Sequence, residues 1–403
     1  MARLSVLLAI AAAAVAISAK PVVIRDSPVT LPIARHFNFT GAANILKATR
    51  RKLSAASVGV GKVFADIDVP VTNAVVTYTA SVGVGTPPTS YDLIIDTGSS
   101  NTWVGAGKAY VQTSSSVDTG DEVEVIYGSG LFFGEEYTDT VIIGDLVIKN
   151  QGVGVAEIAF GFDGVDGILG IGPVDLTEGT TSSGGEIPTV LDTAFGAGSI
   201  DANLIGVSFE PTTQESVTNG ELTFGGVDDS KFTGDIVYVP ITSTSPASDY
   251  VGIDQSITYG SAGTTILAST AGITDTGTTL VLLASDALAA YQTATGAVAD
   301  NNTGLLKITA DQFASLESLF FHIGDTTYEF TPNAQIWPRA LNTEIGGDAD
   351  SIYLVTADLG SNSGEGLDFI DGYTFLERFY YVYDVTNARV GFATTPFTDA
   401  TTN

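Results

Sequence analysis

The sequence predicts an all-β protein with a few short helices, folded into two lobes. Short runs rich in Val, Ile, Thr, Tyr and Phe alternate with Gly and Asp-Gly turns, which is typical of β-strands. From Ala65 onward the chain has roughly 340 residues, more than one hydrophobic core usually serves. The tripeptide Asp-Thr-Gly begins at Asp96 and again at Asp275, about half that length apart. A repeated β unit with one carboxylate per copy implies two lobes and a cleft between them.

Residues 1–19 have the features of a secretory signal peptide. Arg3 supplies the basic start, residues 4–16 the apolar core, and Ile17-Ser18-Ala19 the cleavage region. An uncleaved membrane anchor is the alternative, but this apolar core is too short to span a bilayer comfortably. We therefore expect a secreted, extracellular protein with no membrane partner.

Residues 20–64 form a basic leader ahead of an acidic body. Nine of the 16 basic residues and one of the 46 acidic residues precede Ala65; seven basic and 45 acidic residues remain, so the body has a formal net charge of −38. This contrast predicts a removable activation propeptide that inhibits the body of the same chain. A disordered basic tail is the alternative. The acidic body argues against a nucleic-acid partner and for an acidic working environment.

The body is predicted to divide into an N-terminal β lobe, 65–242, and a C-terminal β lobe, 243–403. The runs that predict strands are Val75–Val82, Tyr137–Ile148, Leu204–Phe209, Leu222–Phe224, Ile236–Ile241 and Tyr328–Phe330. The segments with helical spacing are Ile187–Phe195, Ser285–Ala290, Asp311–Phe320 and Thr374–Phe379.

Composition narrows the chemistry to carboxylates. The chain has no cysteine, which rules out thiol nucleophiles, disulfides and thiolate metal sites. Its two histidines, His36 and His322, lie at opposite ends of the chain, and no Gly-x-Ser-x-Gly elbow accompanies them. We expect no cofactor and no metal.

The two Asp-Thr-Gly copies are the most specific chemical signal. Each follows an apolar run and precedes two hydroxyl residues, Ser99-Ser100 in the first copy and Thr278-Thr279 in the second. One copy alone suits any tight turn, because Asp caps the turn and Gly allows a positive φ. Two copies predict that the carboxylates of Asp96 and Asp275 face each other and share one proton. One carboxylate then acts as a base on water while the other acts as an acid.

Further motifs surround the two copies. They are 96–105 (DTGSSNTWVG), 275–280 (DTGTTL), 127–130 (YGSG), 162–170 (FDGVDGILG) and the final Tyr383-Asp384 with 390–393 (VGFA). In their order and spacing, these segments resemble the pepsin family of aspartic endopeptidases, closest to its polyporopepsin-like secreted fungal acid proteinases. The resemblance runs from about Ala65 to the C-terminus. It implies a bilobal, pepsin-like double β-barrel with the active site in the cleft between the lobes.

The resemblance also assigns roles. Asp96 and Asp275 would form the catalytic dyad. The residues implied to support this dyad are Thr97, Gly98, Ser99, Thr276, Gly277 and Thr278. The threonines at 97 and 276 would cross-link the two loops, the glycines would let the backbone lie close to the carboxylates, and the remaining hydroxyls would bond the outer carboxylate oxygens.

A flap over the substrate is implied by the Tyr-Gly-Ser-Gly segment. Tyr127, Gly128 and Ser129 would form the flap, and the hydroxyl of Tyr127 would bond Trp103. Some fungal relatives have Asp where this chain has Ser129, and that Asp favours Lys beside the scissile bond. The preference for Lys is therefore not expected here.

The resemblance places four apolar residues around the substrate, which would be an extended peptide. Ile94, Val165 and Ile168 would line the primary pocket, and Ile273 the pocket across the scissile bond. We therefore expect a preference for hydrophobic residues there. The implied partners are polypeptide substrates, the propeptide and pepstatin-type inhibitors, and the chain is expected to be a monomer.

Two positions stand apart, and two other functions remain open. Asp371 precedes Gly372 where the family usually has an apolar residue, and Asn301-Asn302-Thr303 is an N-glycosylation sequon. The alternative functions are a catalytically silent pepsin-fold binder of proteins and a secreted adhesive or structural protein. The duplicated carboxylates favour the enzyme.

Overall fold

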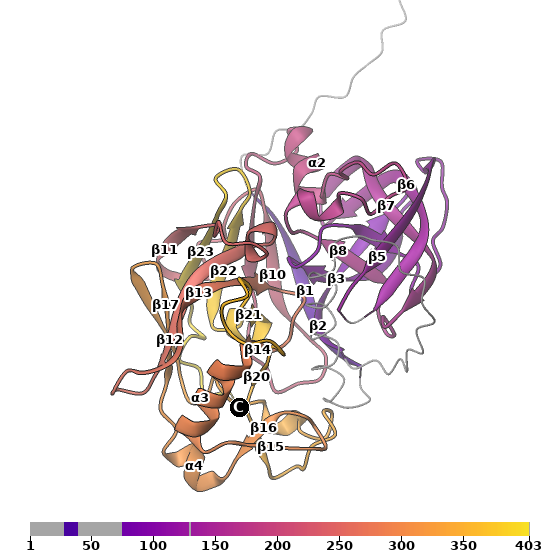
Figure 1. Cartoon of the computed structure of the whole chain (residues 1–403). Coiled ribbons are helices and arrows are strands. Elements are labelled where there is room, and N and C mark those ends of the chain that lie inside the picture. The colour runs from indigo at the N-terminus through magenta and orange to yellow at the C-terminus, as the bar shows by residue number, and fades with distance from the viewer. Residues whose placement is uncertain (1–27, 39–74, 129, 403) are drawn as a thin grey trace, which may run out of the picture.

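The computed structural model describes residues 28–38, 75–128 and 130–402, which form two lobes of barrel-like sheets with a few short helices (Figure 1). The fold class is thus the predicted one. The signal peptide predicted at 1–19 lies outside the described residues, as does most of the predicted propeptide, 20–64. The proposed lobe boundary at 242/243 falls between β11 and β12, but strands from beyond it return to the first sheet.

The larger sheet has 13 strands in the order β11-β23-β22-β9-β10-β1-β2-β3-β8-β4-β7-β6-β5. Its strands are β1 (Val29–Asn38), β2 (Val75–Val84), β3 (Thr89–Asp96), β4 (Thr102–Val104), β5 (Val117–Ile126), β6 (Leu131–Ile143), β7 (Leu146–Phe160), β8 (Gly167–Gly170), β9 (Leu204–Ser208), β10 (Val217–Phe224), β11 (Thr233–Pro240), β22 (Phe379–Asp384) and β23 (Arg389–Thr394). Strands β9 to β11, β22 and β23 continue it from the first lobe toward the second (Figure 1).

The second lobe is built on a sheet of seven strands in the order β18-β17-β12-β13-β21-β14-β20. Its strands are β12 (Gly252–Tyr259), β13 (Thr264–Asp275), β14 (Val281–Leu283), β17 (Leu319–Ile323), β18 (Thr326–Phe330), β20 (Thr356–Asp358) and β21 (Phe369–Gly372). A small third sheet contains β15 (Val298–Ala299), β16 (Leu306–Ile308) and β19 (Ile352–Tyr353). Most buried apolar side chains of both lobes form one main core, and two smaller clusters lie apart from it.

The helices are short, as expected, but their ends correct the prediction. They are α2 (Val190–Gly196), α3 (Ser285–Thr295), α4 (Ala310–Ala314) and α5 (Tyr373–Leu376), with 3₁₀ turns η1 (Val174–Thr177), η2 (Ala247–Asp249) and η3 (Arg339–Leu341). Helix α2 starts after the predicted Ile187 because Thr189 and Asp192 form a capping box. Helices α4 and α5 end before the predicted limits, and β17 and β22 begin within the predicted helical segments.

One predicted strand is in fact a hairpin. The segment 137–148 was expected to be continuous, but β6 ends at Ile143 and β7 begins at Leu146. Gly144 adopts φ 55°, a conformation that suits the tight turn between these two antiparallel strands. None of the helices in the described part of the chain is long and apolar enough to cross a membrane.

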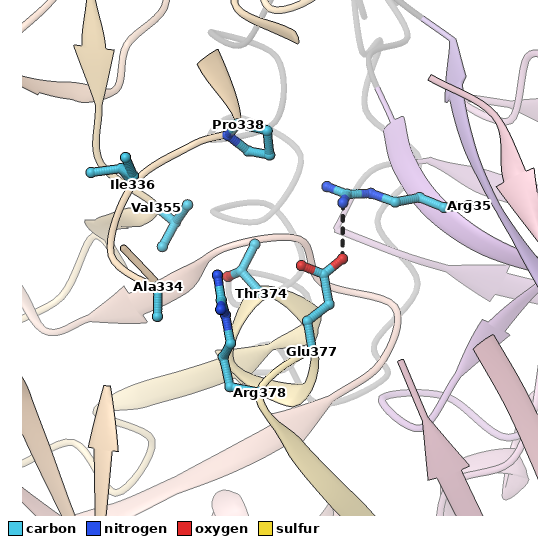
Figure 2. Close-up of a pocket in the computed structure, with 8 residues that line it drawn as sticks. All are labelled: Arg35, Ala334, Ile336, Pro338, Val355, Thr374, Glu377 and Arg378. Atoms are coloured by element: carbon cyan, nitrogen blue, oxygen red, sulfur yellow. Dashed lines mark ion pairs between the residues drawn. The ribbon is translucent and has the colours of Figure 1, made fainter. Parts of the chain in front are cut away.

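The leader contributes a strand to the body. β1, which lies within the predicted propeptide, is hydrogen-bonded to β10 on one side and to β2 on the other. Leu31 and Ile33 are buried in the main core. The guanidinium of Arg35 is fully buried and lies 2.9 Å from the carboxylate of Glu377, just after α5 (Figure 2). This part of the leader is thus an integral strand of the larger sheet.

Candidate active site

Each Asp-Thr-Gly motif begins at the last residue of a buried strand. Asp96 ends β3, whose parallel neighbour β8 places Gly170 beside it. Asp275 ends β13, whose parallel neighbour β21 places Gly372 beside it. Both glycines are needed because a Cβ atom on either would collide with the backbone that follows the motif, at Ser100–Asn101 in one lobe and at Leu280 and Thr278 in the other. The same arrangement thus occurs once in each lobe.

Reciprocal threonine bonds join the two motifs. The backbone N–H of Thr97 donates to Oγ1 of Thr276 at 3.0 Å, and the N–H of Thr276 donates to Oγ1 of Thr97 at 3.0 Å. The Thr276 hydroxyl donates to the carbonyl of Ile95 at 3.0 Å, whereas the Thr97 hydroxyl lies 3.4 Å from the carbonyl of Thr274. Both threonine side chains are fully buried. These bonds hold the two lobes together directly beneath the carboxylates.

The two carboxylates have matching partners. Asp96 accepts from the N–H of Gly98 at 3.0 Å and from the hydroxyl of Ser99 at 2.5 Å. Asp275 accepts from the N–H of Gly277 at 2.9 Å and from the hydroxyl of Thr278 at 2.6 Å. Each carboxylate therefore has one backbone and one hydroxyl donor.

Gly277 shows how close the two carboxylates are. A Cβ atom there would collide with Oδ1 of Asp96 and would lie 3.3 Å from Oδ1 of Asp275. The structure therefore brings both sequence-predicted carboxylates against one point. A pair in contact can share a proton, with one member ionised as a base and the other protonated as an acid.

The segment predicted to form the flap lies in the turn between β5 and β6. Tyr127 follows β5, and its N–H donates to the carbonyl of Gly130 at 2.7 Å. Its buried hydroxyl accepts from the indole N–H of Trp103 at 2.9 Å. Burial raises the pKa of this hydroxyl well above its usual range, and the nearby Asp96 carboxylate raises it further. The hydroxyl of Tyr127 therefore stays protonated beside the first motif. Gly128 is buried in the turn, and Ser129 lies outside the described residues.

Three of the four predicted pocket residues share one apolar cluster. Ile94, Val165 and Ile168 are buried together with Tyr127 and Trp103, in a group separate from the main core. Ile273, the fourth, belongs to the main core of the molecule two residues before Asp275. The cluster thus joins the expected primary pocket to the flap.

Two aromatic residues of this cluster were not predicted from the sequence. Phe132 stacks on Trp103 with ring centroids 4.3 Å apart, and Phe162 meets Trp103 edge-on at 4.8 Å. Phe162 also contacts Tyr127 edge-on at 5.4 Å. The alternation of β6 after the turn could have indicated Phe132. Its two neighbours in the strand are only partly buried, whereas Phe132 is fully buried.

Asp371, the departure from the family pattern, is a buried carboxyl. It accepts a hydrogen bond from Nε2 of Gln255 at 3.2 Å. Its Oδ2 and the Oε1 of Gln255 have no other hydrogen-bond partner among the described residues. Burial raises the pKa of Asp371 to about 8, opposed by the Gln255 hydrogen bond. A protonated carboxyl is the form that suits this site.

Comparison with known proteins decides the family. The sequence profile described as eukaryotic aspartyl protease matches residues 77–395, most of the chain. The chain belongs to this pepsin family of aspartyl proteases. As a member, it is an aspartic-type endopeptidase, a hydrolase that acts on polypeptides.

Individual relatives of this family agree. The chain is 66% identical to polyporopepsin from Irpex lacteus over 337 residues, which cover 83% of this chain and 99% of that protein. It is 32% identical to gastricsin from Cavia porcellus over 335 residues, 79% of this chain and 80% of that protein. The crystal structure of the aspartic proteinase from Irpex lacteus superposes with a TM-score of 0.82 at 58% identity, covering 94% of this chain and 100% of the other.

Proposed function

We propose that this aspartic protease hydrolyses peptide bonds with a water molecule activated jointly by Asp96 and Asp275. The observation that carries the proposal is the pair of motifs held face to face by reciprocal threonine bonds. One carboxylate takes a proton from water as the water attacks the peptide carbonyl, and the other carboxyl donates a proton to the carbonyl oxygen. Fixed donors to both carboxylates keep them oriented throughout.

Single substitutions test the dyad. Asp96→Asn and Asp275→Asn each retain the shape of the site but remove one titrating group. Because acid and base act as a unit, either change is expected to lower the digestion of an unfolded protein at acid pH by several orders of magnitude. Pepstatin should abolish the wild-type activity in the same assay. A variant with more than about a tenth of wild-type turnover would be incompatible with the dyad.

The same assay distinguishes the enzyme from a catalytically silent binder. Both carboxylates, both threonines and the flap tyrosine are present and bonded, which favours catalysis over the binder. An inactive wild-type protein that still binds pepstatin would favour the binder instead.

The apolar cluster supports a preference for hydrophobic residues beside the scissile bond. Ile94, Val165 and Ile168 offer an apolar surface, and Phe162 adds an aromatic edge. Burying an apolar substrate side chain there stabilises the complex by about 25 cal/mol per Å² of covered surface. Peptides with Phe or Leu on either side of the bond should be cleaved faster than matched peptides with Lys or Asp.

The chain is further proposed to be secreted as an inactive zymogen. The charge contrast between leader and body supports this, as does the place of β1 within the larger sheet. Arg35 of this strand pairs with Glu377 (Figure 2). Its guanidinium also lies over the ring of Tyr373. Burial raises the pKa of the Glu377 carboxyl despite the opposing charge of Arg35. Glu377 therefore takes up a proton earlier than an ordinary carboxyl as pH falls, which removes the negative charge that Glu377 places beside the buried guanidinium of Arg35.

Acid activation is tested with Glu377→Gln, which mimics the protonated state at neutral pH. The wild-type proenzyme should be nearly inactive at about pH 7 and should lose the residues before about Ala65 at about pH 3–4. Mass spectrometry of Glu377→Gln should show the same loss at a higher pH. A fully active enzyme that keeps its leader would refute self-activation. A basic side chain of the leader, Lys52 or Lys62, is further proposed to lie near the dyad at neutral pH. Both lysines and the proposed processing sites lie outside the described residues.

Asn301 is proposed to carry an N-linked glycan. It is exposed in a turn after Asp300, and Thr303 completes the sequon. Treatment with an N-glycosidase should lower the mass of the wild-type protein by that of a glycan and leave the mass of Asn301→Gln unchanged.

The mature enzyme is also proposed to be a monomer, which its sedimentation would test.

A further inference from the structure

A tyrosine hydroxyl lies beneath the paired motifs. Tyr381 is fully buried in β22, and its hydroxyl is 2.9 Å from Oγ1 of Thr274, the residue before Asp275. The Thr274 hydroxyl also lies 3.1 Å from the carbonyl oxygen of Val251. A carbonyl only accepts, and the threonine has one hydrogen, so Thr274 donates to Val251 and Tyr381 donates to Thr274.

The same threonine also reaches the other lobe. Its carbonyl oxygen lies 3.4 Å from the hydroxyl of Thr97, which belongs to the first motif. Thr274 thus connects the hydroxyl of Tyr381 both to the residue after Asp96 and, along its own strand, to Asp275.

This connection lies where the threonine bonds are unequal. The Thr276 hydroxyl lies 3.0 Å from its carbonyl acceptor, but the Thr97 hydroxyl lies 3.4 Å from the carbonyl of Thr274. A hydrogen bond at 3.4 Å is weak, so the position of Thr274 depends more on the bonds of its own side chain to Tyr381 and Val251. The position that corresponds to Thr274 in the first lobe is Ile95, which has no hydroxyl. The extra network therefore exists on the Asp275 side alone.

We propose that Tyr381 is a positioning residue for catalysis, which sets the loop of Asp275 against the loop of Asp96 through its bond to Thr274. The proposal rests on the dyad proposed above. Burial raises the pKa of the Tyr381 hydroxyl far above the working range of the enzyme, so it remains a donor throughout. An offset of a fraction of an ångström between two groups that share a proton lowers the rate without weakening substrate binding.

Tyr381→Phe tests the proposal, because it removes the hydroxyl and keeps the ring. The loss of one buried bond predicts a fall in kcat of roughly threefold to tenfold. KM should be unchanged, and one limb of the pH profile of kcat should move. Thr274→Val should have a similar effect, and the double variant should be no worse than either single variant because both act through one bond.

Tyr383→Phe is the matched control. Tyr383 lies two residues along β22 and is also buried, and within the described chain its hydroxyl has no hydrogen bond to either motif. This variant should keep the wild-type kcat and pH profile. Urea unfolding of all variants separates lost stability from lost turnover, and Thr274→Val serves if Tyr381→Phe does not fold.

Three outcomes overturn the proposal in distinguishable ways. If Asp275→Asn is inactive but Tyr381→Phe keeps the wild-type kcat and pH profile, Tyr381 has only a packing role. If the effects of Tyr381→Phe and Thr274→Val simply add, the route through Thr274 is wrong. If Asp275→Asn remains active, the dyad itself fails, and the role of Tyr381 fails with it.

Discussion

Asp371 should make the folded protein more stable at acid pH than at neutral pH, and Asp371→Asn should reduce this pH dependence of stability. Its pKa rises from 3.8 to about 8 on folding. Between these values the folded state binds a proton that the unfolded state has lost, so the free energy of unfolding falls as pH rises. The stabilisation that comes from protonated Asp371 is fully present below about pH 4, and it is completely lost above about pH 8. At about 1.4 kcal/mol per pH unit, the loss from pH 4 to pH 7 is on the order of 4 kcal/mol.

Asn in place of Asp371 keeps the size and cannot ionise. Its amide can accept from Nε2 of Gln255 and donate to the Oε1 of Gln255 that has no other partner, as a protonated carboxyl would. Urea unfolding at pH 4, 5, 6 and 7 gives the difference in the free energy of unfolding between Asp371→Asn and the wild type. Both proteins also have Asp96→Asn, which prevents self-digestion. That difference should be small at pH 4 and grow to several kcal/mol at pH 7. A difference that does not change with pH would refute a buried neutral carboxyl.

Two further changes follow from the same structure. Burial, and to a lesser extent the charge of Asp121, raises the pKa of Glu136 to about 8. The free energy of unfolding of Glu136→Gln should therefore increase relative to that of the wild type as pH rises from 5 to 7 in the same assay. A difference in this free energy that stays constant across the range would contradict the prediction. Tyr127→Ala should fold but should have a lower kcat/KM for peptides, because it removes the contact of the flap with Trp103. Tyr127→Phe keeps the ring and should lower kcat/KM less. Unchanged peptide kinetics in the Ala variant would argue against a flap role.

The sequence predicted what is local and repeated. The Asp-Thr-Gly copies, the hydroxyl residues after them and the YGSG turn are contiguous motifs, so their placement at strand ends and at a hairpin could be expected. Pairing between distant segments could not. The bond between Thr274 and Tyr381 spans 107 residues, and nothing near either residue indicates the other.

The sequence also did not predict where some strands begin. Residues 374–379 have helical spacing, yet Phe379 begins β22 because its backbone pairs with Thr394 in β23. Tertiary pairing overrides local preference there. Likewise, the charge of the leader suggested an electrostatic partner, but charge says nothing of the hydrogen bonds that place β1 between two strands of the body.

The position of β1 has a consequence for how the protein is best produced. β2 and β10 are each paired to β1 and not to each other. A chain expressed from Ala65 must therefore find another strand for both edges while it folds, and open strand edges promote association between copies. The full-length chain includes a strand of the right length and pattern. Refolding from denaturant should give a higher soluble yield with residues 20–64 attached, and light scattering of the two preparations would show the difference.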